Sequence, residues 1–432
     1  MEKIIHHRYR VFIVLTLILA WSVIGRTAEA SCIPTSKNRP VCPAEITPED
    51  ATFIDPTVAI KRSESIAIGR HTYIGPFAGL NTRGEIEIGE KTNLQDSVIL
   101  SGEGKVSLGD EVILAHGAQV HAPVTIGRTA IAGEHNASFV GFNSRIDGAN
   151  VEHDAMVLHL ARVAPGITIK HGKVVLTGKE ITTQEQADNS ALGKVIPITA
   201  ALREFMDGVL HVNETFAKEY SRMYQQNENT VTGINFDPSD GGATPSFNPR
   251  HDLPTLAGVV TQDRKHRNRI IGDIKMADSL SVVNDEDGPY GRQISLRADE
   301  GEPIHLGHVA KMNSRTSFHA LEHTGLDLHD DISFGFRSLV HGGSSVATQG
   351  NPHSNTVVGD HSKIADYAVV FRSVLGHNVK VGCGSLVDSV TLANAAVVPA
   401  RTVVSPSGTS AVEWDPGCKE KKQEKDDEGE DD

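Results

Sequence analysis

The sequence predicts an all-β protein made of two tandem parallel β-helices, with one long helix following the first. Two observations predict this class. Aliphatic residues recur at every sixth position through two long stretches of the 432-residue chain, a period that fits neither an amphipathic helix nor an ordinary strand but is typical of a parallel β-helix. Glycine is plentiful, with 40 residues, whereas aromatic residues contribute 5%. This composition suits a regular coil with small residues at its corners.

The first 30 residues have the order of a secretory signal peptide. Three basic residues precede an apolar run at 11–24, and the triplet Ala28–Ala30 places small residues at the expected cleavage positions. We therefore expect residues 1–30 to be removed and the mature protein to be secreted or periplasmic. The alternative is a retained membrane anchor, which is less favoured because the run is short for a bilayer.

Residues 31–50 are expected to form a proline-rich N-terminal linker. In an exported chain the four cysteines can pair, and Cys32 with Cys42 is the obvious local candidate. Cys383 either joins such a pairing or packs as a small apolar residue inside a coil.

The first β-helix is expected over residues 51–185. Its repeats begin at an aliphatic residue that is often followed by glycine, as at Ile68-Gly69, Ile74-Gly75 and Leu108-Gly109. Three repeats make one triangular coil of about eighteen residues, with the aliphatic side chains stacked inside.

An amphipathic helix that packs on this first β-helix is predicted over residues 186–226. Its apolar stripe falls within 198–226, where apolar residues are three and four positions apart. They are Leu202, Phe205, Val209, Val212, Phe216, Tyr220 and Met223.

The remaining chain repeats the first architecture without a second helix. Residues 227–257 are a linker by their proline, glycine and polar composition. The six-residue period then returns, so that a second β-helix is expected over 258–411, followed by an acidic disordered tail at 412–432. The formal net charge of −14 argues against a nucleic acid as partner, and no membrane contact is expected once the signal peptide is removed.

Both halves resemble the gamma-class carbonic anhydrases over nearly all of the mature chain. The motifs in the first half are NLQDSVIL (Asn93–Leu100), LAHGAQVHAPVTIG (Leu114–Gly127) and HVNETFAKEY (His211–Tyr220). In the second half they are LRADEGEPIHLG (Leu296–Gly307), FHALE (Phe318–Glu322) and LVHGG (Leu339–Gly343). The resemblance implies left-handed β-helices that assemble through their faces. It also implies a zinc ion held between two of them, by two histidines of one and one histidine of its neighbour.

Neither half carries a complete set of the three histidines that this family requires. The first half has Ser101 in place of the first histidine and keeps His116 and His121, whereas the second keeps His319 and His341 but has Phe336 at the middle position. Because a catalytic zinc needs three protein ligands and one open position, each half taken alone looks disabled.

The spacing of the surviving residues predicts one composite site. In the second half, Glu300, His319 and His341 follow one another at about one coil, so they are expected on one face. In the first half, Asn93 and Gln95 are similarly spaced from His116. His121 has turned the corner onto the next face and is interpreted as a structural remnant. We therefore expect the intact face of one β-helix to meet the intact face of the other.

The resemblance then assigns roles to the residues of this composite site. The expected metal ligands are His116, His319 and His341, with Zn²⁺ as the ion and Fe²⁺ or Co²⁺ as ions that the family also accepts. The implied activity is the reversible hydration of CO₂ to bicarbonate by metal-bound hydroxide. Glu300 and Glu322 would move the proton, with His323 as a further relay candidate. The residues expected to orient the reactants or to form an ion pair between the prisms are Asn93, Gln95, Asn213, Arg297 and Asp299.

Two other functions stay open at this point. The lost motif positions also fit a non-catalytic β-helical scaffold or binding protein, in which the histidines are ordinary surface residues. An acyltransferase of the wider hexapeptide class is less favoured because no basic patch for a nucleotide is evident. The composite contact could form within one chain, between two chains, or with a related subunit, so an oligomer or pseudo-oligomer is expected.

Overall fold

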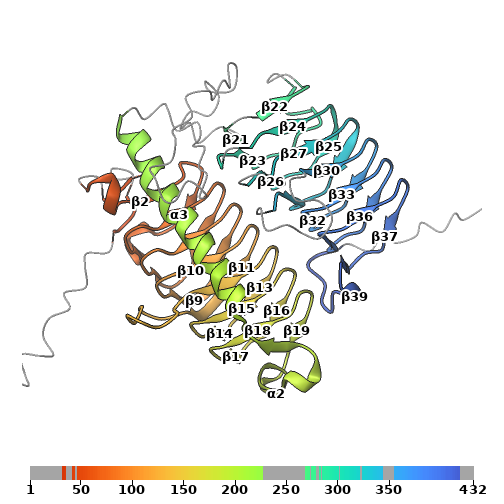
Figure 1. Cartoon of the computed structure of the whole chain (residues 1–432). Coiled ribbons are helices and arrows are strands. Elements are labelled where there is room, and N and C mark those ends of the chain that lie inside the picture. The colour runs from red at the N-terminus through yellow and green to blue at the C-terminus, as the bar shows by residue number, and fades with distance from the viewer. Residues whose placement is uncertain are drawn as a thin grey trace, which may run out of the picture.

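The computed structural model describes residues 32–35, 41–43, 46–226, 268–272, 274–278, 282–283, 285–300, 302–321, 324–343 and 355–418. They form two prisms of short strands, which lie side by side (Figure 1). This confirms the predicted class of two tandem parallel β-helices with one long helix after the first. The predicted signal peptide, residues 1–30, and the predicted linker, 227–257, lie outside the described residues.

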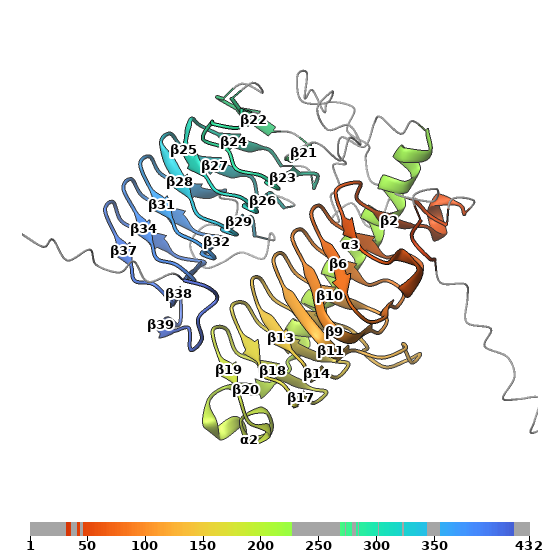
Figure 2. The ribbon, with the colours of Figure 1, turned by 180° about the vertical axis from the view of Figure 1, so that it is seen from behind.

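The first prism is a coil whose faces are parallel sheets, seen from the opposite side in Figure 2. One face contains β1 (Val41–Cys42), β2 (Thr52–Ile54), β5 (Tyr73–Ile74), β8 (Asn93–Leu94), β10 (Val112–Leu114), β12 (Ser138–Val140), β15 (Ala155–Val157), β18 (Lys173–Val175) and β20 (Val195–Pro197). The other strands are β3 (Ala59–Ile60), β4 (Ile66–Ile68), β6 (Gly79–Thr82), β7 (Ile86–Ile88), β9 (Ile99–Leu108), β11 (Gln119–Ile126), β13 (Arg145–Asp147), β14 (Asn150–Val151), β16 (Arg162–Val163), β17 (Thr168–Ile169) and β19 (Glu180–Ile181). Short 3-10 turns lie at Pro48–Asp50, Ser63–Ser65 and Ser190–Leu192.

The second prism has three separate sheets. One face contains β21 (Arg269–Gly272), β23 (Ser295–Ala298), β26 (Ser317–His319), β29 (Leu339–His341), β32 (Val369–Phe371), β35 (Leu386–Asp388), β38 (Thr402–Ser405) and β39 (Gly408–Ala411). The second face contains β22 (Ile274–Met276), β24 (Ile304–Leu306), β27 (Leu326–Leu328), β30 (Thr356–Val358), β33 (Val374–Leu375) and β36 (Thr391–Leu392). The third contains β25 (Val309–Met312), β28 (Ile332–Phe334), β31 (Lys363–Ile364), β34 (Lys380–Val381) and β37 (Val397–Val398).

The six-residue period exists because one aliphatic residue per strand points into the prism. In the first prism Ile74, Leu94 and Leu114 stack in register on successive coils and are fully buried. In the second, Leu296, Phe318 and Val340 do the same. Each prism therefore has its own apolar core, and the residues that flank these positions point outward and are free to build a contact face.

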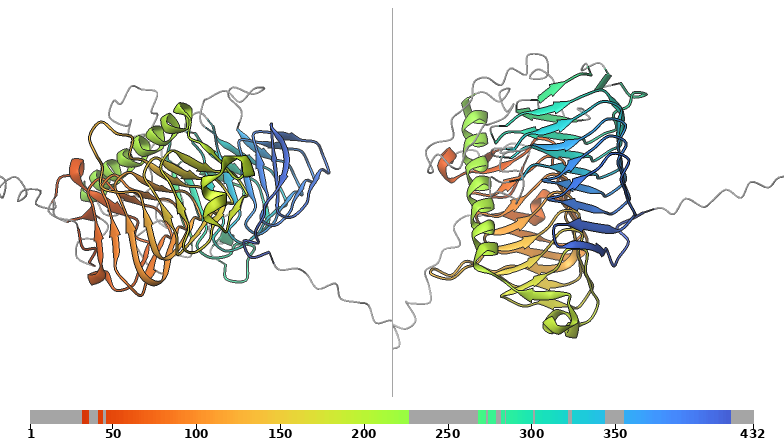
Figure 3. Two further views of the ribbon diagram at one scale, coloured as in Figure 1. Left: turned by 90° about the horizontal axis from the view of Figure 1, so that it is seen from below. Right: turned by 45° about the vertical axis from the view of Figure 1, so that its right-hand side comes forward.

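The long helix α3 (Ala200–Gln226) begins later than the predicted start at 186. The chain first forms the short helix α2 (Gln184–Asp188), whose N-cap Thr183 accepts a hydrogen bond from the backbone N–H of Gln186, and then β20, which pairs antiparallel with β18. Both views of Figure 3 show α3 lying along the first prism, as predicted, where it packs on β2, β5, β8 and β10. Phe205, predicted to belong to its buried stripe, is instead exposed.

The two prisms dock through a continuous series of contacts that follows the same order in both. The buried ion pair Asp55–Arg269 lies near the first coils, at 2.9 Å. The Asn143 side chain donates to the backbone oxygen of Arg337 further along, at 3.1 Å. An apolar cluster that includes Ile113 and Phe142 of the first prism and Leu339 of the second fills the space between them. The predicted contact between two prism faces therefore forms within one chain.

The C-terminal segment differs from the predicted tail at 412–432. Residues 412–418 are described: Val412 and Trp414 are buried in the cluster between the prisms, and the Trp414 indole donates to the backbone oxygen of Leu160 at 2.5 Å. The disulfide Cys383–Cys418 fixes the end of this segment, so Cys383 is paired rather than free inside the coil. Residues 419–432 lie outside the described residues.

The N-terminal pairing Cys32–Cys42 is present as predicted, and with it all four cysteines are in disulfides. Within the described part of the chain, no helix is long and apolar enough to cross a membrane.

Candidate metal centre

The second prism presents several of its predicted site residues in one row. Arg297 of β23 pairs in register with His319 of β26, His319 pairs with His341 of β29, and His341 with Phe371 of β32. Residues in register on parallel strands project from the same side of the sheet, so these four side chains form one row. The prediction placed Glu300 one coil before His319. The register residue is Arg297, and Glu300 follows the end of β23.

The first prism contributes His116 from the turn that follows β10. Its side chain is buried, with 1% of its surface exposed. The backbone N–H of His116 donates to the side-chain oxygen of Gln95 on the preceding coil at 3.2 Å, which fixes the turn. Gln95, predicted to orient the reactants, therefore acts on the backbone of a candidate ligand.

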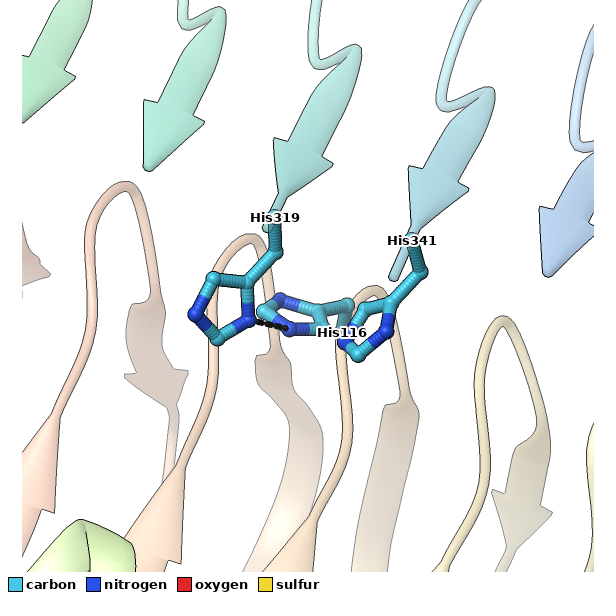
Figure 4. A group of neighbouring side chains, drawn as sticks. All are labelled: His116, His319 and His341. Carbon is cyan, nitrogen blue, oxygen red and sulfur yellow. Dashed lines mark hydrogen bonds between the residues drawn. The ribbon is translucent and has the colours of Figure 1, made fainter. Parts of the chain in front are cut away.

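The three predicted ligands meet across the contact between the prisms (Figure 4). The imidazole centroids of His116, His319 and His341 are 5.0 to 5.1 Å apart, and one nitrogen of each lies within 4.8 Å of the others. Nε2 of His116 is 3.1 Å from Nδ1 of His319. Two nitrogens bound to one tetrahedral zinc are about 3.3 Å apart, so the geometry fits three ligands on a single ion.

The protonation of His116 and His341 also suits metal ligands. Burial lowers the pKa of both imidazoles well below the usual value, so each is neutral at pH 7 and keeps a lone pair. Nδ1 of His341 lies 2.8 Å from the backbone oxygen of Gly342 and can donate to it. That hydrogen bond selects the tautomer in which Nε2 is the available ligand atom.

His319 is held differently, by two carboxylates. Its Nε2 lies 3.3 Å from Asp299 and 3.2 Å from Glu300, while its Nδ1 faces His116. Burial and the charge of Arg297 lower the pKa of His319, but the two carboxylates outweigh them and the net shift is upward. A histidine whose far nitrogen faces a carboxylate is the usual arrangement of an oriented metal ligand.

Arg297 connects the two prisms beside this site. Its guanidinium is fully buried and donates to Asp96 of the first prism at 2.7 Å and to Asp299 at 2.9 Å. The hydroxyl of Tyr220, from α3, donates a hydrogen bond to the Asp299 carboxylate at 2.5 Å. Burial raises the pKa of Asp299, but the charge of Arg297 together with the interactions of His319 and Tyr220 holds this pKa well below its usual range. The predicted ion pair of Arg297 and Asp299 is thus part of a larger network.

The other predicted residues fall in three groups. Asn93 is buried in β8, and neither its side-chain oxygen nor its nitrogen has a hydrogen-bond partner among the described residues. Asn213 is buried in α3 and donates to Val209 of the same helix at 2.8 Å, with no bond to a histidine of the site. Glu322 and His323 lie outside the described residues.

His121 lies apart from the three histidines, as predicted. It belongs to β11, is partly exposed, and its Nδ1 is 2.7 Å from Asp147. A second group of possible ligands, His329, Asp360 and His377, lies on the surface of the second prism. Its side chains are far more exposed than those of the buried group.

Two aromatic residues near the histidines were missed by the sequence analysis. The ring of Phe142 is 4.8 Å from that of His341 and 5.8 Å from that of His116, and Phe371 is 5.4 Å from His341. They give the site an apolar wall. Phe371 could have been predicted from the spacing, because it pairs in register with His341 on the next strand. Phe142 becomes a neighbour of the histidines only when the prisms dock.

The fold and this site define a duplicated β-helical protein with a buried three-histidine group shared by its two prisms. No family model matches the chain. The carbonic anhydrase of Methanosarcina thermophila is 28% identical over 185 residues, which are 41% of this chain. The chain spans 66% of the length of that relative. The resemblance to carbonic anhydrases indicated by the motifs is thereby confirmed.

Among solved structures, a hexapeptide transferase family protein from Anaplasma phagocytophilum aligns with 18% identity and a TM-score of 0.21, covering 40% of this chain and 93% of its own.

Proposed function

We propose that the protein is an exported, zinc-dependent carbonic anhydrase of the gamma class with one composite site per chain. The observation that carries the proposal is the meeting of His116, His319 and His341, from both prisms, with one nitrogen of each within 4.8 Å of the others. The similarity to a curated carbonic anhydrase supports the reaction. Two disulfides support export, because such bonds persist in oxidising compartments.

The three histidines would hold the ion, and their nitrogen donors suit Zn²⁺ while also accepting Fe²⁺ or Co²⁺. Bound zinc supplies a water ligand whose pKa is lowered to about 7, which makes a nucleophile available near neutral pH. Phe142 and Phe371 exclude bulk water and offer an apolar surface that suits CO₂. The unpartnered amide of Asn93 is available to hydrogen-bond bicarbonate.

Carboxylates at the edge of the site would carry the proton released during CO₂ hydration to solvent. Glu300 is the described candidate, since its Oε1 is 3.2 Å from Nε2 of His319 and it retains 5% exposure. A side chain at that position both orients the imidazole and offers a route for the proton to solvent. The predicted second carrier is Glu322.

The first prediction concerns the metal and the reaction together. Replacing His116, His319 or His341 by alanine is expected to strip the metal, because two ligands hold zinc poorly. The full chain should bind about one zinc, measured by elemental analysis, and CO₂ hydration followed by stopped flow should fall with the metal content of each variant.

The matched control is His121→Ala, which removes a histidine of the same motif outside the group. It should keep both metal and activity. Metal loss in this variant alone would reverse the assignment of the ligands. A full chain without metal or activity would instead favour the β-helical scaffold.

A further inference from the structure

A polar pocket lies between the prisms, next to the histidine group. Its volume is about 10 Å³, which is room for about one water-sized particle. It is lined chiefly by Ser97, His116 and Gly117 of the first prism and by Arg315, Ser317 and Arg337 of the second. Apart from His116, none of these residues has a role in the proposed reaction.

The pocket carries two positive charges that no carboxylate of the described residues neutralises. Arg337 is buried, with 5% exposure, and its guanidinium donates only to the neutral backbone oxygens of Ser97, at 3.1 Å, and Gly117, at 2.7 Å. Arg315 is half-buried beside it. Burial and the charge of Arg315 lower the pKa of Arg337 to about 10, so that Arg337 stays charged at neutral pH.

The nearest carboxylate along the chain is already committed elsewhere. Asp96, adjacent to Ser97, accepts hydrogen bonds from Arg297 at 2.7 Å and from the Ser295 hydroxyl at 2.5 Å. A buried charge without a partner is costly. The arrangement of Arg315 and Arg337 therefore calls for a negative group from outside the described chain.

Unused hydrogen-bond donors line the same pocket. The hydroxyls of Ser97 and Ser317 and the Nε of Arg337 are buried and have no hydrogen-bond partner among the described residues. Both serines are almost completely buried, at 2% and 3% exposure. Buried polar groups are normally paired, and three unpaired donors beside two guanidinium groups are the complement of an anion.

The backbone keeps this pocket open. Gly117 has a φ of +73°, and a Cβ at that position would lie 2.2 Å from Oδ1 of Asn143 and 3.6 Å from the guanidinium of Arg337. A side chain at 117 would therefore be strained and would crowd the pocket. Glycine lets the turn beside His116 approach Arg337 closely enough to accept its hydrogen bond.

We propose that this pocket binds one small monovalent anion of the size of chloride, held by Arg315, Arg337, Ser97 and Ser317. The volume accommodates a single-atom ion and disfavours sulfate or phosphate. The anion would offset one of the two positive charges. Because its ligands come from both prisms, it would also strengthen the docking that brings His116 to the other two histidines. The site requires neither bound metal nor catalysis, so it goes beyond the proposed activity.

The test compares thermal unfolding of the full chain in sodium chloride and in sodium gluconate at equal ionic strength. Binding to the folded state alone raises stability, so chloride is expected to raise Tm by about 3 °C. Sulfate, which stabilises folded proteins generally by exclusion from their surface, should raise Tm equally in the unmutated chain and in Arg337→Gln. The Arg337→Gln variant should lose the rise in chloride, and Ser317→Ala, which removes a single hydroxyl and should fold, should weaken it.

Two controls separate this site from general salt effects and from the metal. Arg83→Gln changes an exposed arginine paired with Glu103 and should keep the full chloride response. His341→Ala, which removes a proposed metal ligand, should also keep it. Crystals grown in bromide should show an anomalous peak beside Arg337. Equal Tm values in chloride and gluconate, or ordered water in place of bromide, would overturn the proposal.

Discussion

Arg297 illustrates how one buried side chain links the two prisms. It bridges Asp96 and Asp299, and its guanidinium lies over the ring of Phe216 at 5.0 Å. Truncating it would leave two buried carboxylates without their cation. Removing one partner of a buried ion pair costs about 3–5 kcal/mol, so Arg297→Ala is expected to lower the free energy of unfolding by that amount, measured by urea unfolding.

The contrast with an exposed pair makes this prediction specific. Arg83 and Glu103 form an ion pair on the surface of the first prism. Exposed pairs contribute about 0–1 kcal/mol, so Arg83→Ala should shift the urea midpoint little. Similar losses in both variants would show that Arg297 does not act through its buried charges.

His159 should make the fold sensitive to mild acid. Burial, and to a smaller degree the charge of Arg372, lowers the pKa of His159 to about 3, and its Nδ1 accepts the backbone N–H of Phe142 at 3.0 Å. The folded state therefore requires the neutral ring. The stability that depends on it is complete above the unfolded pKa of about 6.5 and is lost as the pH falls toward 3, at about 1.4 kcal/mol per pH unit.

This pH dependence can be measured by urea unfolding at pH 7 and pH 5. The unmutated chain should lose about 2 kcal/mol more between these values than His159→Gln, because glutamine offers an acceptor that does not titrate in this range. Parallel losses in the two proteins would exclude His159 as the source.

At the residue scale, the sequence allowed the meeting of the three histidines to be predicted, because the coil of a β-helix places residues of known spacing on the same face. His319 and His341 are one coil apart and pair in register, and His116 was assigned because it follows Gln95 at about one coil. Phe142 and Arg337 could not be found in this way. Their roles depend on which outward-facing residues meet when the prisms dock, and periodicity along the chain carries no information about that meeting.

At the scale of elements, the six-residue aliphatic period predicted the two β-helices, but the sequence analysis was wrong about two segments whose structure depends on tertiary contacts. The predicted helix at 186–226 begins at Ala200, because residues 195–197 pair with β18 instead. The predicted tail included Trp414, which is buried between the prisms. Neither antiparallel pairing nor docking leaves a periodic pattern in such short segments.

The segment 412–418 is expected to act as a clasp between the prisms. Glu413 forms ion pairs with Lys179 at 3.1 Å and Lys194 at 2.6 Å, and Trp414 fills the adjacent apolar cluster. Replacing a buried aromatic residue by alanine costs about 3–5 kcal/mol. Trp414→Ala should therefore lower the free energy of unfolding by about 3 kcal/mol and weaken zinc binding.

The control for this clasp is Trp414→Phe, which keeps most of the apolar contact and loses the hydrogen bond to Leu160. It should retain most of the stability in circular dichroism–monitored urea unfolding. Unchanged zinc affinity in Trp414→Ala would mean that the histidines meet without help from the C-terminal segment.

At the scale of the whole molecule, the two prisms together supply the three histidines that neither supplies alone. Compared with the histidine pattern of the gamma-class carbonic anhydrases that both halves resemble, the first prism has Ser101 and the second has Phe336 at a histidine position. The faces that carry His116, His319 and His341 are nevertheless the faces that dock. A closed ring of identical interfaces would repeat one contact between like prisms. Here a single contact between unlike prisms joins the three histidines, and it lies within one chain.

This arrangement predicts the result of mixing inactive variants. Since His116 and His319 of the same chain lie 3.1 Å apart, a chain carrying His116→Ala and a chain carrying His319→Ala should each lack the site. Mixing them, or refolding them together, should restore neither zinc binding nor CO₂ hydration. If the site formed between chains instead, association of the two variants would bring an intact His116 of one chain to an intact His319 of the other, and activity would return. Recovery in the mixture, with a native mass above that of a single chain, would therefore contradict the intrachain site.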